Sequence, residues 1–107
     1  MSRTQESVLE RLIEQAVRLG GDALDVDYRA GHEEVCAMRG AIGWGIASLR
    51  SSSREGIALR EELHGLMHKR RRVMIGGDAY VLVGTKRDSF GETAFRVDVR
   101  PARRARP

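Results

Sequence analysis

Two runs of alternating apolar and polar residues lie on either side of the tetrapeptide FGET at residues 90–93. Upstream the sequence reads IGGDAYVLVGTKRDS, and downstream it reads AFRVDVR. A period of two is the spacing of side chains on one face of a β-strand. Gly76-Gly77 supplies the residues that a tight hairpin turn requires. We therefore predict a three-stranded meander over residues 72–100, with turns at Gly76-Gly77 and near residues 88–91.

Residues 4–19 have the periodicity of an amphipathic helix. Their apolar side chains recur every three or four positions and form one face. These side chains are Val8, Leu9, Leu12, Ile13, Ala16 and Leu19. We expect Ser2 with Gln5, or Thr4 alone, to cap the start of this helix. Gly20-Gly21 is expected to end it, because glycine adopts the left-handed conformation at low cost.

A second helical pattern covers residues 51–70. Its core-facing stripe consists of Leu59, Leu63, Leu66 and Met67. Ser52 and Glu55 have the spacing of a capping box. Gly56 and Gly65 each weaken a helix by roughly 1 kcal/mol relative to alanine. This helix is therefore expected to depend on packing against a sheet.

Residues 22–29, 33–39 and 42–49 are three further predicted strands. Gly43 and Gly45 share one face of the third, which indicates a β-bulge or the close approach of a helix. The predicted order of elements is α-β-β-β-α-β-β-β. Short turns between successive strands favour an antiparallel sheet of about five to six strands, with two helices on one face. The predicted fold class is thus α+β, a two-layer sandwich.

The net charge of +4 comes from the last eight residues, which hold four of the 19 lysines and arginines. The remaining residues, 1–99, contain fifteen basic and fifteen acidic side chains. We expect residues 1–100 to form one domain and residues 101–107 to be a disordered Arg-rich tail. The balanced body does not predict a strongly basic binding surface.

The cysteine content and the hydropathy pattern indicate the compartment. Cys36 is the only cysteine in the sequence, so no intramolecular disulfide can form. This is typical of proteins in a reducing environment. The sequence has no apolar run as long as a membrane span, and its first residues are too charged for a signal peptide. We expect a cytoplasmic protein without membrane insertion.

The glycines do not form a phosphate-binding loop. Residues 84–86 read GTK, which lacks the register of a Walker loop, where lysine directly follows the second glycine of the motif. Residues 40–45 read GAIGWG and are not followed directly by a helix whose N-terminus could bind phosphate. We predict no cofactor.

Three side chains of the second helix, Glu61, His64 and His68, have the spacing of metal ligands. They fall within about 60° of one another around an ideal helix. This arc is opposite the leucine stripe and should face water, with Arg54 and Arg71 nearby to oppose a cation. We therefore expect no metal site here.

Four other residues were candidates for chemistry. Asp25 and Asp27 project from the same face of one strand, as an acid–base or metal pair would, but an open sheet face also needs polar residues. His32 is expected in a turn without a partner. Cys36 fits a small core or strand residue better than a nucleophile. We predict no catalytic residue and no enzymatic activity.

The densest basic run inside the fold, HKRRR, occupies residues 68–72. It ends the second helix, where the helix dipole favours positive charge. As an alternative, these residues and the tail form a contact surface for RNA or for an acidic partner. The candidate contact residues are Lys69, Arg70, Arg71, Arg72, Arg103, Arg104 and Arg106. The aromatic residues that RNA-binding sheets use for stacking are scattered along this sequence, so we expect any such binding to be weak.

The stretch IGGDAYVLVGTKRDSFGETAFRV resembles the end of the N-terminal domain of type II secretion and type IV pilus assembly ATPases. There a Gly-Gly hairpin precedes a Tyr-containing strand, a turn closing on Gly-Glu, and a strand rich in apolar residues and arginine. The matching residues are Ile75, Gly76, Gly77, Tyr80, Thr85, Gly91, Glu92 and Arg96. Upstream, LIEQAVRLGGDALDVDY is similar to the first helix and strand of that domain through Leu12, Ala16, Gly20, Leu24 and Val26.

The resemblance implies a bacterial protein-interaction or assembly domain. The sequence does not include the motor domain of that family, so the resemblance implies a stand-alone or detached domain without ATP hydrolysis. Asp25 stands where the family has His and Ala23 where it has Asp, and no arginine matches the one that follows Tyr80 in the family. The expected partner is another protein that binds to the surface of this domain.

Overall fold

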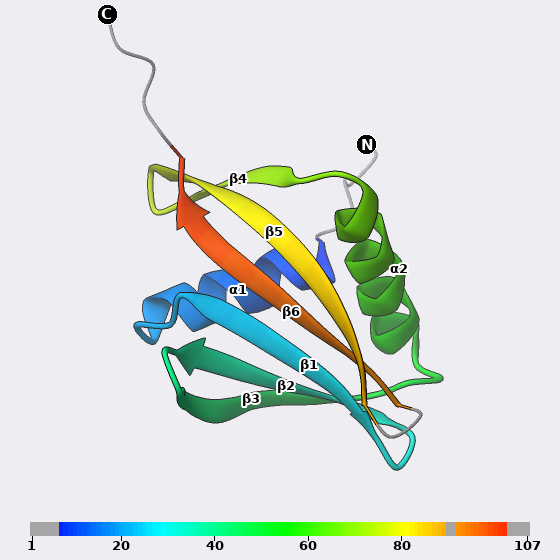
Figure 1. Ribbon diagram of the computed structural model, residues 1–107. Helices are drawn as coiled ribbons and strands as arrows, with labels where there is room; N and C mark the ends of the chain where they lie inside the picture. Colours follow the sequence, from blue (N-terminus) through cyan, green and yellow to red (C-terminus); the bar gives the residue numbers. More distant parts are fainter. Residues whose placement is uncertain (1–6, 90–91, 103–107) are drawn as a thin grey trace, which may run out of the picture.

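A computed structural model gives the fold of residues 7–89 and 92–102 (Figure 1). The order α-β-β-β-α-β-β-β is as predicted. In chain order the elements are α1 (Val8–Arg18), β1 (Ala23–Arg29), β2 (His32–Arg39), β3 (Ile42–Arg50), α2 (Arg54–His68), β4 (Arg71–Ile75), β5 (Asp78–Ser89) and β6 (Glu92–Pro101).

The six strands form one antiparallel sheet in the order β3-β2-β1-β6-β5-β4. Each half of the sheet is a meander, and the two halves join where β1 pairs with β6. In this central pair Asp25 lies opposite Arg96 and Val26 opposite Phe95. The first and the last strand of the fold are therefore neighbours, while β3 and β4 form the two edges (Figure 1).

The core lies between the sheet and the two helices, which pack on one face of it. The predicted leucine stripe of α2 is confirmed, with Leu59, Leu63 and Leu66 buried and Met67 partly buried. Side chains from both helices and five strands complete the core, including Leu9, Ile13, Leu24, Val35, Val73, Leu82 and Val97. The fold is the predicted α+β two-layer sandwich. We refer to the sheet face without helices as the open face.

Helix α1 begins later than the sequence predicted. Its N-cap is Ser7, whose Oγ accepts a hydrogen bond of 3.1 Å from the backbone N–H of Glu10. The helix therefore starts at Val8, four residues after the expected first residue. The expected caps lie outside the described residues: Ser2, Thr4 and Gln5.

The end of α1 agrees only in part with the prediction. Gly20 has a φ of +90°, the left-handed conformation expected of a glycine that ends a helix. Leu19, which was expected on the apolar face, is the C-cap residue and is half exposed. Its backbone has left the helical path, so its side chain no longer follows the stripe that Leu12 and Ala16 continue.

The cap of α2 is also displaced by one residue from the predicted Ser52. Ser53 is the N-cap, and its Oγ accepts a hydrogen bond of 3.0 Å from the N–H of Gly56. The same Oγ donates to the carbonyl oxygen of Arg50 at 2.5 Å, so Ser53 ties the end of β3 to the start of α2. Gly56 is buried there, and an added Cβ would collide with the carbonyl oxygen of Arg50.

Strand β3 contains a bulge, one of the two alternatives that its glycines indicated. Gly45 lies opposite Cys36, but Ala47 lies opposite Val35. Ile46 is therefore an extra residue on β3, and the register shifts at this point. No helix approaches Gly45, because nothing lies within 4 Å of an added Cβ there.

The predicted meander at the C-terminal side is confirmed. Gly76 and Gly77 turn β4 into β5 with φ values of +58° and +85°. The second turn, at residues 90–91, lies outside the described residues. Beyond the expected boundary at residue 100, β6 continues to Pro101, and the N–H of Ala102 donates to Ala79 at 2.9 Å. The rest of the expected tail, residues 103–107, is not described.

Candidate functional site

The basic residues that follow α2 lie in three different environments: the end of the helix and the two faces of the sheet. Lys69 is the C-cap of α2, and its N–H donates to the carbonyl oxygen of Gly65 at 3.1 Å. Lys69 and Arg70 are exposed. Arg71 and Arg72 are the first two residues of β4, so their side chains point to opposite faces of the sheet. The structure therefore does not bring these four candidate contact residues together on one surface.

Arg71 is held in a network between the two helices. Its guanidinium contacts the carboxylate of Glu62 at 2.8 Å and that of Glu10 at 3.4 Å. It also donates to Oγ of Ser7 at 3.4 Å. Arg71 thus links β4 to both helices and is a structural residue. The other candidate contact residues, Arg103, Arg104 and Arg106, lie outside the described part of the chain.

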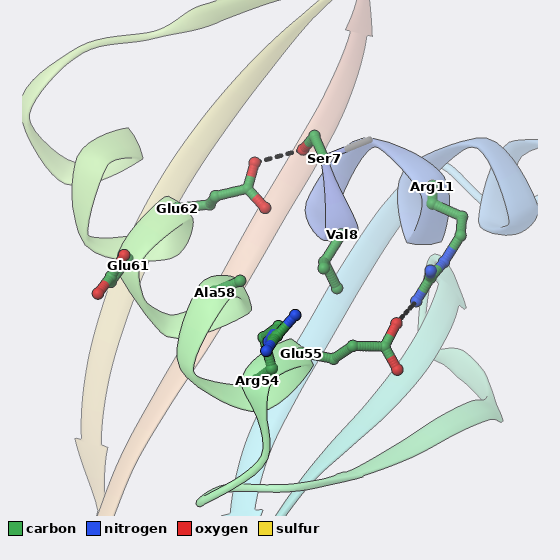
Figure 2. Close-up of a pocket in the computed structure, with 8 residues that line it drawn as sticks. All are labelled: Ser7, Val8, Arg11, Arg54, Glu55, Ala58, Glu61 and Glu62. Atoms are coloured by element: carbon green, nitrogen blue, oxygen red, sulfur yellow. Dashed lines mark hydrogen bonds and ion pairs between the residues drawn. The ribbon is translucent and has the colours of Figure 1, made fainter. Parts of the chain in front are cut away.

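Glu62 is the centre of this network. One of its carboxylate oxygens accepts hydrogen bonds from the hydroxyl of Ser7 and from Arg71, and the other accepts the N–H of Leu9 at 3.0 Å. Figure 2 shows Glu62 pointing from α2 toward Ser7. Burial raises the pKa of Glu62, but the hydrogen bonds from Arg71, Ser7 and Leu9 together lower it by more than burial raises it. The pKa therefore lies below its ordinary value.

A hollow of about 440 Å³ lies beside this network, between the start of α1 and the N-terminal half of α2. Its lining residues are Ser7, Val8, Arg11, Arg54, Glu55, Ala58, Glu61 and Glu62 (Figure 2). Arg11 and Glu55 form an ion pair of 2.5 Å across it. The Ser7 hydroxyl donates to Glu62 and accepts from the backbone N–H of Glu10.

A buried carboxylate with a partly exposed arginine partner was not predicted from the sequence. The side chain of Glu33, on β2, is only 2% exposed and accepts a hydrogen bond from the hydroxyl of Ser51. Arg60 of α2 lies 3.8 Å from its carboxylate and 5.9 Å from the ring centre of Tyr28. The alternation of β2 could have predicted that Glu33 is buried, because Glu33 lies two residues before the buried Val35 and points to the same face.

The two aspartates of β1 lie on the open face, as expected. Asp25 is half-buried and pairs with Arg96 at 3.5 Å, while Asp27 is exposed. Arg96 in turn contacts Asp98 at 3.1 Å. Burial raises the pKa of Asp25, the charge of Arg96 offsets this only in part, and the charge of Asp27 adds to the rise. These residues form an ion-pair chain across the central strands.

Cys36 lies on the open face of β2 and is half-buried, so it is a strand residue and not a core residue. Burial raises the pKa of its thiol, and the carboxylates of Asp27, Asp25 and Glu34 raise it further. A thiol with a raised pKa is a poor nucleophile, because the thiolate is the reactive form.

The three histidines lie at the surface of α2 or at the start of β2. Glu61, His64 and His68 are exposed, as predicted, and the ring of His64 packs edge-on against Phe95 at 5.2 Å. His32, which was expected in a turn, is the first residue of β2. Within residues 7–89 and 92–102, no group of three or more His, Cys, Asp or Glu side chains is placed to hold a metal ion.

The two edges of the sheet differ in length and in charge. The edge at β4 has five residues, two of which are arginines. The edge at β3 has nine residues, and between Ile42 and Leu49 none is charged. Short strands, charged side chains and bulges are the usual protection of a sheet edge against pairing with other chains. β3 has a bulge and the terminal Arg50, but it is long and carries no charge between Ile42 and Leu49. We refer to residues Ile42–Leu49 as the β3 edge.

The β3 edge is also the place where the apolar core reaches the surface. Ile42 is 70% exposed. Among the described residues, eight partly buried apolar side chains pack against the core, and four of them belong to β3: Trp44, Ile46, Ala47 and Leu49. Sequence reasoning identified β3 as a strand but did not show that it lies at an edge, because strand order depends on pairings between distant segments.

The chain matches no family model, and no curated protein matches its sequence. Among the described residues, neither helix is long and apolar enough to cross a membrane.

Proposed function

We propose that this chain is a non-catalytic protein-interaction or assembly domain that binds a protein partner along the β3 edge. In this role it resembles the N-terminal domain of type II secretion and type IV pilus assembly ATPases. It acts in the cytoplasm, where a free, half-buried cysteine such as Cys36 stays reduced.

The observation that carries this proposal is the open, uncharged β3 edge. In an antiparallel sheet, half of the backbone N–H and C=O groups of an edge strand point away from its neighbour and stay free to pair. Strand addition to such an edge is a common mode of protein recognition. The main-chain hydrogen bonds supply affinity, and the exposed Ile42 and the half-buried Trp44 supply apolar contacts.

The charged side chains support a structural role instead of a catalytic one. Glu62 caps a helix, Glu33 is held by Ser51 and Arg60, and Asp25 pairs with Arg96. Each of these carboxylates has a partner inside the fold. An acid or base for catalysis must reach a substrate within hydrogen-bond distance, and these three carboxylates are committed to neighbours of their own chain.

The basic run gives less support to the nucleic-acid alternative. Arg71 is bound to Glu62 and Glu10, and Arg72 points to the other face of the sheet. Among the candidate residues that the structure describes, Lys69 and Arg70 are exposed neighbours at the end of α2. Two cations without a stacking platform provide at most non-specific binding.

Site-specific photo-cross-linking in cells tests the proposed function. A photoreactive amino acid replaces Ile42 on the β3 edge or, as a matched control, Met74 on β4, which is 66% exposed. We expect protein adducts from position 42 and few from position 74. Adding Gly45→Lys should remove the adducts from position 42. Equal adducts from both positions, or none from position 42, would contradict the proposal.

A further inference from the structure

We propose that the partner of the β3 edge is a second copy of this chain. The two β3 strands pair antiparallel about a two-fold axis perpendicular to the sheet, which joins two six-stranded sheets into one. This inference rests on the proposed function, since it names the partner for the same edge. Three features of β3 support self-pairing.

The first feature is the absence of charge. Residues 40–49 are the longest uncharged run in a sequence of which 32% is charged. Like charges directly opposite each other destabilise a strand pair, and a strand that pairs with itself brings its own charges together. In a pairing that places Trp44 opposite Ala47 of the second copy, side chains that face the helix side meet each other, and Arg50 lies opposite Ala41. The arginine that ends β3 therefore meets an apolar residue and not another arginine.

The second feature is the incomplete cover of the apolar side chains. Trp44 and Ala47 lie opposite the buried residues Ala37 and Val35, so they face the helix side of the sheet. They are only partly buried because the sheet ends at β3. A two-fold axis perpendicular to the sheet places the helices of both copies on the same side. The second copy thus continues both layers and covers the apolar side chains at the edge.

The third feature is the bulge at Ile46. A bulge bends its strand and increases the local twist, which disturbs pairing with a regular strand. In this self-pairing, each strand brings its bulge at Ile46 next to the two-fold axis. The distortion is then shared symmetrically, whereas a regular strand from another protein would have to deform to match it.

Sedimentation velocity over a concentration series tests this inference on the purified full chain. We expect a monomer–dimer equilibrium, with a mass approaching twice 11.9 kDa at high concentration. Ile42→Lys and Gly45→Lys should each weaken the dimer by about tenfold or more, because lysine on an edge strand opposes pairing. Both positions tolerate the change, since Ile42 is largely exposed and an added Cβ at Gly45 meets nothing within 4 Å.

Met74→Lys is the matched control, because it places the same charge on the opposite edge at a similarly exposed residue. The dimer should be unchanged in this variant. A wild-type chain that stays monomeric at all concentrations, or a dimer that only Met74→Lys dissociates, would overturn the inference. If the wild type is monomeric but position 42 still cross-links to a different protein, the proposed function stands and self-pairing is wrong.

A covalent assay gives an independent answer. In a Cys36→Ser background, Ile46→Cys places the new thiol next to the proposed axis, and mild oxidation should yield a disulfide-linked dimer. Met74→Cys in the same background should remain monomeric. Equal cross-linking of the two variants would show random collision and would contradict pairing at β3.

Discussion

The backbone N–H of Leu9, in the first turn of α1, donates a 3.0 Å hydrogen bond to Oε2 of Glu62 on α2. The first N–H groups of a helix lack partners within the helix, and residues adjacent to the helix usually provide them. Here a carboxylate from a second helix, 53 residues away in sequence, provides one. Its negative charge also interacts favourably with the positive end of the α1 dipole. Glu62 therefore fixes the position of α1 against α2.

We expect Glu62→Gln to lower the free energy of unfolding by about 2 kcal/mol, the typical value of hydrogen bonds to a charged group. The amide retains the shape of the side chain but loses the charge that Arg71 and Leu9 bind. Chemical denaturation at neutral pH measures the change. Glu61→Gln is the control, since Glu61 is exposed one position away and should change stability little. Equal effects of the two substitutions would show that the network contributes no stability.

The same network predicts a dependence of stability on pH. The folded state lowers the pKa of Glu62, so its contribution is fully present above the pKa of an unfolded glutamate, about 4.3. It is lost as the pH falls through the lowered pKa of the folded state. The difference in unfolding free energy between wild type and Glu62→Gln should therefore shrink as the solution is acidified. Denaturation curves between neutral pH and pH of about 3 test this, and a constant difference would contradict it.

Asp25 should behave in the opposite way, because its pKa is raised by burial. A carboxyl with a raised pKa favours the folded state when protonated, and this contribution is lost as the pH rises through its folded pKa. We expect Asp25→Asn to leave stability at neutral pH unchanged or slightly higher, although the ion pair with Arg96 is removed. Asp27→Asn, at an exposed site on the same face, is the control. A marked loss of stability in Asp25→Asn alone would show that the ion pair outweighs burial.

The two glycines of α2 should respond in opposite directions to alanine. Gly65→Ala should stabilise the protein by about 1 kcal/mol, because nothing lies within 4 Å of the added Cβ and alanine favours a helix. Gly56→Ala should destabilise it, because the added Cβ collides with the backbone of Arg50. Thermal denaturation of both variants gives the comparison. Stabilisation by both substitutions would mean that the end of β3 can move away from α2 without cost.

Binding of nucleic acid should be weak and should come from the basic residues after α2 and from residues 103–107. We expect a dissociation constant of about 10⁻⁴ to 10⁻⁶ M near 150 mM salt, the range of non-specific binding. Deleting residues 103–107 should remove most of it, and Arg70→Ala should remove more than Arg71→Ala, because Arg71 is bound to Glu62. Fluorescence anisotropy with single-stranded RNA measures these affinities. Sub-micromolar, sequence-dependent binding that survives the deletion would favour the nucleic-acid alternative over the interaction domain.

Local periodicity was sufficient to predict the elements of this fold, because side-chain alternation and turn glycines act over a few residues. The helix caps were less predictable. Residues 51–53 are three consecutive serines, and only the position of Arg50 at the end of β3 selects Ser53 as the cap of α2. The role of Glu62 could not be derived from the sequence, since it depends on where α2 lies relative to α1. The same holds for the exposure of β3, which follows from strand order.

The pairing of β1 with β6 has a consequence for how the protein is made. Residues Ala23–Asp27 pair with Ala94–Asp98, so the central ladder forms only after the ribosome has translated β6. Until then, the side of β1 that pairs with β6 stays unpaired in the nascent chain. Leu24 and Val26, which are buried in the finished fold, are then exposed on β1. Contacts at such long sequence separation slow folding and expose apolar strands to aggregation. Nascent chains of this protein should therefore be clients of ribosome-associated chaperones until β6 emerges.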